Sequence, residues 1–328
     1  MMGLMTKKLV SVVAEPVLRH VVVNGVSLAY FEWRADLQGV EPTLLMVHAT
    51  GFHARVWDQV IAALPARHVI ALEQRGHGRS QTTAIANWSL FADDLCEFVD
   101  VLALRGVIGI GHSMGAHVLV RAAARDSARS AAAFSRLLLI DPVILSPEAY
   151  RLLGTTKTAS VASATSLAGA ANAPNIASLQ RHPAARRVNH FASAQAMFER
   201  FAQRGPYAVF DPQVLRDYCT HGLQAAPQGQ GFVLACDPIT EASIYSTARD
   251  NADIFDSVRA VPIPVLIVRA KLPAADRRSP DFASSPTWPG LVDLFANGRE
   301  RHLSDQTHLV PMQSPQLIGQ LIRQELAL

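Results

Sequence analysis

The sequence predicts an α/β fold, with a mostly parallel sheet covered by helices on both faces. Through residue 144, short continuous apolar runs alternate with amphipathic helical patterns, as is typical of parallel strands that are buried on both faces. Asn24-Gly25 separates two β-type runs, and this dipeptide favours a tight antiparallel hairpin. The alternation stops after Asp141 and resumes at Pro264. This interruption predicts an insertion within the fold.

The expected elements of the first part follow in chain order. Runs rich in β-branched and other apolar residues predict strands at 17–23, 26–33, 43–47, 68–72, 107–110 and 137–140. Apolar residues that recur every three or four positions predict helices at 56–64, 90–102 and 114–124. Pro65 closes the first of these helices.

The second part contains the insertion and the end of the sheet. Residues 145–257 show no clear strand–helix alternation and include an Ala/Ser-rich stretch. The alternation then resumes with expected elements at 264–268, 288–295, 299–304 and 316–326. We therefore predict a core of residues 17–144 and 258–328, interrupted by a helical insertion over 145–257.

Composition excludes several classes of protein. Hydrophobic residues make up 49% of the 328 residues, which excludes a disordered chain. The net charge of +3 is spread along the chain, so nucleic acid binding is not indicated. Three distant cysteines without a C-x-x-C indicate neither a disulfide framework nor a zinc site. No run approaches the length of a membrane helix, and the apolar stretch at 9–14 is too short for a secretory signal. We expect a soluble cytoplasmic protein.

A candidate nucleophile lies between a predicted strand and a predicted helix. Gly111-His112-Ser113-Met114-Gly115 is a G-x-S-x-G at that junction. A tight strand-to-helix turn needs small residues on both sides of the serine, and it exposes the hydroxyl above the sheet. Serine at its ordinary pKa is a poor nucleophile and needs a base. His308, in a loop after the last predicted strand, is the candidate base, whereas His302 lies within that strand.

The acid that would orient the histidine has two main candidates. Asp141 ends the strand after the candidate nucleophile and is followed by Pro142. Asp276 follows the strand that ends near residue 270, in a longer loop that lacks a W-G-x-x-D turn. We favour Asp141 and keep Asp276 as the alternative. Asp281 is a more remote option, and Asp305 is too close to the histidine in sequence to orient it.

An oxyanion hole needs two backbone N–H groups that point at the developing negative charge. Met114 follows the nucleophile and is expected to supply one of them. The loop after the third strand, His48-Ala49-Thr50-Gly51-Phe52, is expected to supply the other. Thr50 is our choice, with Phe52 as the second choice. His48 is expected to hold this loop by hydrogen bonds.

Five segments in this order resemble the α/β-hydrolase superfamily: H-A-T-G-F (48–52), E-Q-R-G-H-G-R-S (73–80), G-H-S-M-G (111–115), I-D-P (140–142) and T-H-L-V-P (307–311). The resemblance implies the α/β-hydrolase fold, with an eight-stranded sheet, a Ser-His-acid triad and a mobile helical cap, as in esterase-type members. Placing the acid at Asp141 resembles the subgroup with its acid after the sixth strand. The chain departs from the pattern at Ala49, where a glycine is common, and in the missing acid turn after the seventh strand.

The predicted function is hydrolysis of a small-molecule carboxylic ester, lactone or similar acyl compound, without metal or organic cofactor. A C–C bond hydrolase or a cofactor-free haloperoxidase on the same triad is an alternative, as is a non-catalytic ligand-binding protein. Ser113 excludes an aspartate nucleophile. Gly109-Ile110-Gly111 is a poor dinucleotide loop, because Met114 stands at the third glycine position.

Several side chains of the insertion and of the loop after it are candidates for lining the substrate pocket. We expect the aromatic and sulfur side chains at 191, 197, 198, 201, 207 and 210 to be core rather than pocket lining. A solvated surface is expected for Arg181, Arg186 and Arg187. Phe282 and Trp288 are candidates for the border of the pocket.

Overall fold

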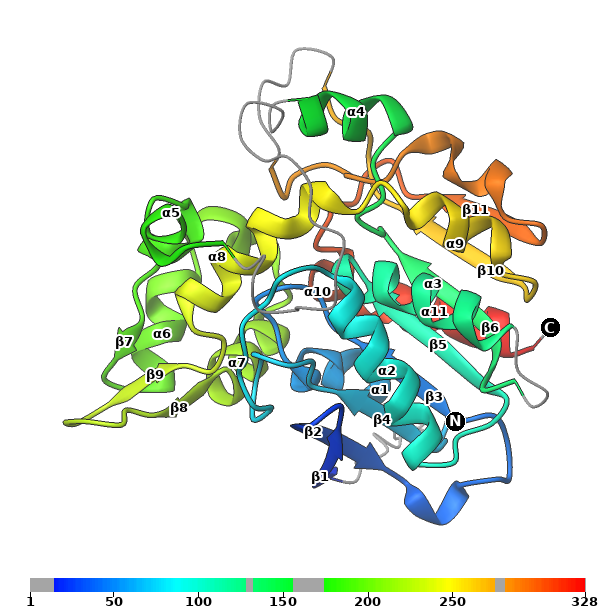
Figure 1. Cartoon of the computed structure of the whole chain (residues 1–328). Helices are drawn as coiled ribbons and strands as arrows, with labels where there is room; N and C mark the ends of the chain where they lie inside the picture. Colours follow the sequence, from blue (N-terminus) through cyan, green and yellow to red (C-terminus); the bar gives the residue numbers. More distant parts are fainter. Residues whose placement is uncertain (1–14, 128–131, 156–173, 275–280, 328) are drawn as a thin grey trace, which may run out of the picture.

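The computed structural model describes residues 15–127, 132–155, 174–274 and 281–327. Its centre is an eight-stranded sheet in the order β1-β2-β4-β3-β5-β6-β10-β11 (Figure 1). The strands are β1 (Val17–Val23), β2 (Val26–Trp33), β3 (Leu44–Val47), β4 (Val69–Leu72), β5 (Val107–His112), β6 (Phe134–Ile140), β10 (Val265–Arg269) and β11 (Gly298–His302). β2 is antiparallel to β1 and β4, and the pairs from β4 to β11 are parallel. The predicted α/β class and the mostly parallel sheet are confirmed.

Helices cover both faces of the sheet. α2 (Ser89–Val101), α3 (Met114–Asp126) and α9 (Ile254–Ala260) lie on one face, and α1 (Asp58–Ala62) and α11 (Pro315–Leu326) lie on the other (Figure 1). On β6, Leu137 and Leu139 pack into the core under the first group, whereas Leu138 and Ile140 pack under the second. Because successive side chains of a strand point to opposite faces, both faces need apolar residues, which explains the continuous apolar strands.

The segment between β6 and β10 contains both helices and a small sheet. Its α-helices before α9 are α4 (Pro147–Thr155), α5 (Ile176–Gln180), α6 (Ala194–Phe201), α7 (Pro212–His221) and α8 (Pro238–Thr247). β7 (His190–Phe191), β9 (Phe232–Leu234) and β8 (Leu223–Ala225) form a separate three-stranded antiparallel sheet. The sequence predicted helices alone, since strands of two or three residues are too short to show a period.

Two boundaries differ from the expected elements. The predicted end of the insertion at residue 257 falls inside α9, whose Ile254 and Val258 pack with α2 and α3 in one core. The element expected at 288–295 is a 3₁₀-helix over Pro289–Leu294. The division of the chain into core and insertion stays a prediction.

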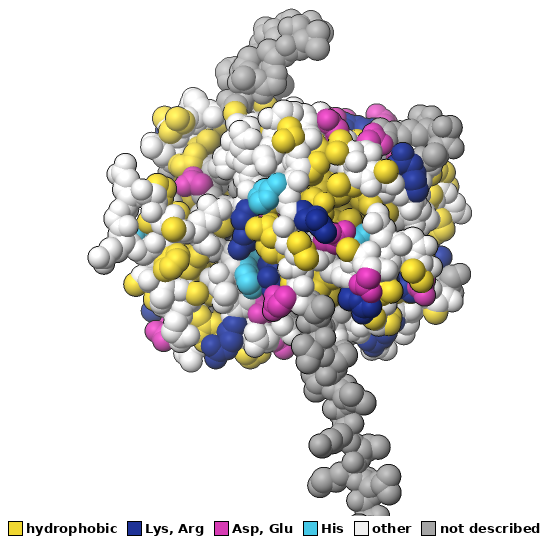
Figure 2. All heavy atoms as spheres, turned by 90° about the horizontal axis from the view of Figure 1, so that it is seen from below, with side chains coloured by type: hydrophobic (Ala, Val, Ile, Leu, Met, Phe, Trp, Pro, Cys, Tyr) yellow, Lys and Arg dark blue, Asp and Glu magenta, His cyan; other side chains and the backbone are white. Residues whose placement is uncertain are grey.

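Charged side chains are mixed with other kinds on the surface. On the face shown in Figure 2, basic and acidic side chains of the described residues are interspersed among hydrophobic and other ones. Within the described ranges, none of the helices is long and apolar enough to cross a membrane.

Several buried or half-buried histidines are neutral in the folded protein at pH 7. Burial lowers the pKa of His77 and His221 to about 4, and that of His112 and His117 to about 3. Between these values and the unfolded pKa of about 6.5, the unfolded chain binds more protons than the fold. The stability that depends on these neutral histidines is therefore fully present above about pH 6.5 and is lost as the pH falls toward about 4.

Each of the fully buried histidines, His77, His112 and His117, should contribute up to about 1.4 kcal/mol per pH unit to this loss. Guanidinium unfolding between about pH 7 and pH 5 should show a falling free energy of unfolding. His117→Gln removes one of these groups, so the free energy of unfolding should fall less steeply with pH, by up to about 1.4 kcal/mol per pH unit. A stability that stays level or rises on acidification would contradict this prediction.

Candidate active site

The G-x-S-x-G segment forms a tight turn between β5 and α3. Ser113 has φ 57° and ψ −117°, a conformation that is unfavourable for a residue with a side chain. A Cβ atom on Gly111 would lie 2.7 Å from the backbone of Ala116, and one on Gly115 would lie 2.3 Å from the carbonyl oxygen of Val47. Neither position has room for a side chain. The predicted turn with small residues on both sides is therefore present.

Gly115→Ala should destabilise the protein by about 3 kcal/mol, because its methyl group would meet rigid backbone of β3. It should also slow any reaction of Ser113, since the turn must shift to accommodate it. Gly154→Ala in α4 is the matched control, because a Cβ atom there has no neighbour within 4 Å and alanine favours a helix. Denaturant unfolding measures both variants. Equal stability of the two variants would contradict the prediction.

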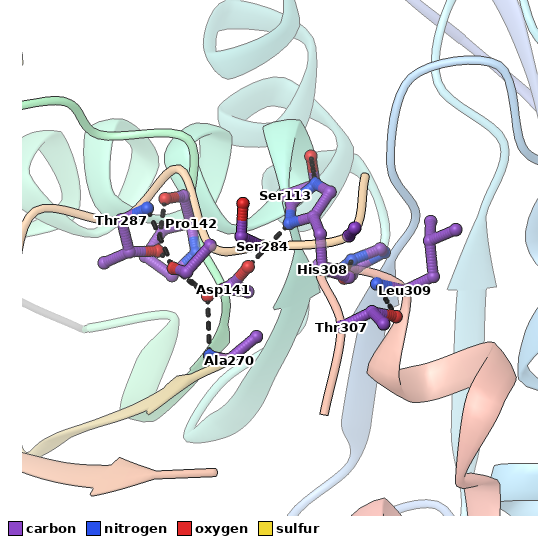
Figure 3. A network of polar contacts seen from close by, with 12 residues as sticks. Ser113, Asp141, Pro142, Ala270, Ser284, Thr287, Thr307, His308 and Leu309 are labelled. Atoms are coloured by element: carbon purple, nitrogen blue, oxygen red, sulfur yellow. Dashed lines mark hydrogen bonds and ion pairs between the residues drawn. The ribbon is translucent and has the colours of Figure 1, made fainter. Parts of the chain in front are cut away.

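The structure brings Ser113, His308 and Asp141 together (Figure 3). His308 lies in the loop between β11 and α10 (Val310–Gln313). Its Nε2 atom is 3.0 Å from Ser113 Oγ, and its Nδ1 atom is 2.6 Å from Asp141 Oδ2. All three residues are buried. A neutral imidazole can thus donate its Nδ1 proton to the carboxylate and accept the serine proton at Nε2.

The Asp141 carboxylate is held from the side opposite the histidine. It follows β6 in a left-handed conformation, with φ 46°. Its Oδ1 atom accepts hydrogen bonds from the Ala270 backbone N–H (2.9 Å), Ser285 Oγ (2.5 Å) and Thr287 Oγ1 (3.3 Å). A buried carboxylate is costly unless it is paired and hydrogen-bonded, and these donors meet that need. Figure 3 shows Asp141 between His308 on one side and Ala270 and Thr287 on the other.

The other described candidates do not contact His308 through an ion pair. Asp276 lies outside the described residues. The Asp281 carboxylate accepts hydrogen bonds from Ala283 and Ser284. Asp305 and His302 are exposed. Among the described candidates, Asp141 is the acid that contacts His308.

Within the described residues, two N–H groups of the loop after β3 make no hydrogen bond, those of Ala49 and Thr50. Phe52 N–H donates to the Ala49 carbonyl (3.2 Å), and Gly51 N–H donates to His77 Nε2 (3.0 Å). Thr50 Oγ1 donates to Met114 Sδ (3.3 Å), so the two expected donor residues are neighbours. Met114 begins α3, where a backbone N–H has no partner within the helix.

His48 holds the loop after β3 by hydrogen bonds, as expected. Its Nε2 atom accepts from the Gln74 N–H (3.1 Å), and its Nδ1 atom donates to the Ala49 carbonyl (2.7 Å). Burial holds its pKa well below the ordinary value, so the ring is neutral. It ties the loop after β3 to the segment that follows β4.

Comparison with known proteins decides the family. Residues 44–319 match the model of a family described as "Alpha/beta hydrolase family". The chain belongs to this family. An E-2-(acetamidomethylene)succinate hydrolase has a similar structure, with a TM-score of 0.69, 22% identity, and 95% of this chain and 100% of that chain covered. The enol-lactonase from Burkholderia xenovorans LB400 has a TM-score of 0.60 at 19% identity, with 94% and 100% covered. At these identities the likeness shows the fold alone.

Sequence similarity to curated proteins covers part of the chain. The 2-(acetamidomethylene)succinate hydrolase of Mesorhizobium japonicum is 32% identical over 120 residues, which are 35% of this chain and 42% of that protein. The non-heme chloroperoxidase CPO-A1 of Kitasatospora aureofaciens is 30% identical over 125 residues, 37% of this chain and 44% of that protein. The matched region thus spans less than half the length of each of these two relatives.

In this alpha/beta hydrolase, the expectation that Arg187 lies on a solvated surface is wrong. Its guanidinium forms an ion pair with Glu241 and donates hydrogen bonds to the hydroxyl groups of Tyr207 (2.9 Å) and Tyr218 (3.0 Å). Arg181 and Arg186 are exposed, as expected. Spacing alone does not reveal this cluster, because its members come from four separate segments.

The aromatic candidates divide into two groups. Side chains of the insertion pack against one another in a shared core, as expected: Phe191, Met197, Phe198, Phe201, Tyr207 and Phe210. Phe282 stacks on the ring of His308, with 6.2 Å between centroids, and therefore borders the site. Trp288 instead packs against Phe255 and donates its backbone N–H to the Ile144 carbonyl.

Proposed function

We propose that this chain is a serine hydrolase that cleaves a carboxylic ester, lactone or similar acyl compound. The observation that carries the proposal is the hydrogen-bonded series of Ser113, His308 and Asp141. In it, a hydroxyl group meets an imidazole whose other nitrogen faces a buried carboxylate. This arrangement activates serine for attack on a carbonyl carbon.

The reaction proceeds in two stages. Ser113 Oγ attacks the carbonyl carbon while His308 Nε2 takes its proton, and Asp141 stabilises the resulting imidazolium. The carbonyl oxygen becomes an oxyanion, which accepts hydrogen bonds from the N–H groups of Thr50 and Met114. His308 then protonates the leaving alcohol oxygen, and an acyl-enzyme remains. Water attacks this ester with His308 again as the base, which releases the acid and restores Ser113.

We assign to residues 145–257 the role of a cap over this site. Glu241 of α8 lies close to Gly51, because a Cβ atom built on that glycine would be 2.7 Å from Glu241 Oε1. The insertion thus touches the loop that carries the proposed Thr50 donor. The relatives named for hydrolysis of a substituted succinate and of an enol-lactone agree with an acyl substrate.

The proposal is tested with a panel of p-nitrophenyl esters of increasing acyl length and a panel of simple lactones. Turnover of one class, with an acyl adduct on Ser113 trapped by acid quench and seen by mass spectrometry, is the expected result. Absence of both turnover and adduct across the panels would contradict it.

A second candidate is a cofactor-free haloperoxidase activity. It is favoured by the likeness to the chloroperoxidase CPO-A1 and to the non-heme haloperoxidase of Rhodococcus erythropolis, which is 28% identical over 128 residues. Halogenation that depends on peroxide and halide, at a rate above that of ester hydrolysis, would promote this candidate.

A further inference from the structure

The segment Glu73–Ser80 follows β4 and lies against the loop that carries Thr50. Three hydrogen bonds join the two segments. The Gln74 N–H donates to His48 Nε2 (3.1 Å), and the Gln74 side-chain amide donates to the His48 carbonyl (2.8 Å). The Gly51 N–H donates to His77 Nε2 (3.0 Å). The last of these bonds reaches the turn at Ala49–Phe52 itself.

His77 acts as a hydrogen-bond acceptor in a fixed orientation. Its ring is fully buried, and its Nδ1 atom lies 3.1 Å from the Arg75 carbonyl. An N–H group that points at Nε2 requires this nitrogen to be unprotonated, so the proton lies on Nδ1 and is donated to Arg75. Burial lowers the pKa of His77 to about 4, which agrees with a neutral ring. The His48 ring packs edge-on against it, 4.8 Å away.

The segment around His77 is held by contacts of its own. The Glu73 carboxylate is buried, accepts a hydrogen bond from the Arg79 backbone N–H (2.5 Å), and forms an ion pair with the Arg79 guanidinium (2.8 Å). A Cβ atom on Gly78 would lie 2.1 Å from that carboxylate. Glu73, Gly78 and Arg79 thus form one packed unit around His77.

The acceptor on His77 matters because of where Gly51 lies. Gly51 has φ 77° and is the third residue of the turn closed by the Phe52 N–H and the Ala49 carbonyl. In such a turn, glycine tolerates more than one orientation of the peptide before it. The bond to His77 selects one orientation for the Thr50–Gly51 peptide. The Thr50 N–H belongs to the preceding Ala49–Thr50 peptide, so the bond to His77 acts on it through the Thr50 backbone that the two peptides share.

We propose that His77 is a positioning residue for the oxyanion hole, and that its Nε2 atom fixes the Ala49–Phe52 turn so that the Thr50 N–H faces the carbonyl oxygen above Ser113. This inference rests on the proposed function. It gives the segment Glu73–Ser80 a role in the reaction through its hydrogen bonds to the loop after β3.

His77→Leu and His77→Gln test the proposal together. Leucine fills the space without an acceptor, whereas the glutamine side-chain carbonyl can accept the Gly51 N–H. His68 supplies matched controls, because it is equally buried and bonded to Thr43 (2.7 Å) and Glu32 (3.0 Å), but it precedes β4 rather than following it. His68→Leu and His68→Gln therefore report the loss of a buried histidine away from the site.

The measured quantities are kcat and KM for a p-nitrophenyl ester and the affinity for an aryl trifluoromethyl ketone, whose adduct with serine carries an oxyanion. His77→Leu should lower kcat and the ketone affinity about 10- to 100-fold with little change in KM, since loss of a whole donor costs about 10²- to 10³-fold. His77→Gln should recover most of both. The His68 variants should keep kcat and ketone affinity even where their stability falls.

The proposal is overturned if His77→Leu keeps kcat and ketone affinity at the level of His68→Leu, or if leucine and glutamine at position 77 behave alike. If His77→Leu does not fold, His77→Asn replaces it, because its shorter side chain cannot reach the Gly51 N–H. Failure of the proposed function is seen separately, as absence of ester turnover and adduct in the unaltered protein.

Discussion

Ser113→Ala should lower kcat for the preferred ester by about 10⁴- to 10⁶-fold, because it removes the atom that forms the acyl-enzyme. His308→Ala should cost a similar factor, since serine without its base is not activated. The double variant should be little worse than either single variant, because the two residues act as one unit. Steady-state kinetics of the three proteins, at matched folded concentration, measure this.

The control for the serine is Ser135→Ala. Ser135 is an exposed residue of β6 whose hydroxyl donates to the Gly106 carbonyl, at the far end of the strand from Asp141. Its kcat should stay near that of the unaltered protein. Retention of ester turnover by Ser113→Ala would move the reaction to another residue and refute the proposed mechanism.

Asp141→Asn should lower kcat by about 10⁴-fold, the cost expected when an amide replaces the carboxylate of a triad. The amide cannot stabilise the imidazolium, and an N–H group facing His308 Nδ1 favours the wrong tautomer. The stability should change little, because the amide oxygen can still accept the three hydrogen bonds made to Oδ1 while the nitrogen faces His308. Kinetics and thermal unfolding together separate the two effects.

Asp276→Asn is the comparison that decides between the two acids named from the sequence. It should leave kcat near that of the unaltered protein. Near-normal activity in Asp141→Asn, with a large loss in Asp276→Asn, would sink the assignment of Asp141 and promote Asp276.

Local sequence signals were sufficient to predict the turn around Ser113 and a mostly parallel sheet. A Cβ atom on Gly111 or Gly115 would lie less than 3 Å from backbone atoms. The turn therefore requires glycine at both positions, and this requirement is visible in the sequence. The apolar alternation of the strands is equally visible, since both faces of the sheet are covered. The position of Asp141 at the end of a predicted strand likewise favours it as the acid.

Features that depend on distant segments left no local signal. Ser285 and Thr287 donate to Asp141 across more than 140 residues of chain, and no spacing rule connects them. The burial of Arg187 depends on partners from separate elements, such as Glu241 and Tyr218. The acceptor role of His77 needs the approach of two loops that follow different strands. Tertiary packing, rather than propensity, decides all of these.

The most direct test of the central claim is intact mass after exposure to a fluorophosphonate, followed by peptide mapping. A single adduct on Ser113, which is absent in His308→Ala, is the predicted result, since only an activated serine reacts in this way. Absence of an adduct under conditions that fully label a known serine esterase, or an adduct on a different residue, would contradict the account.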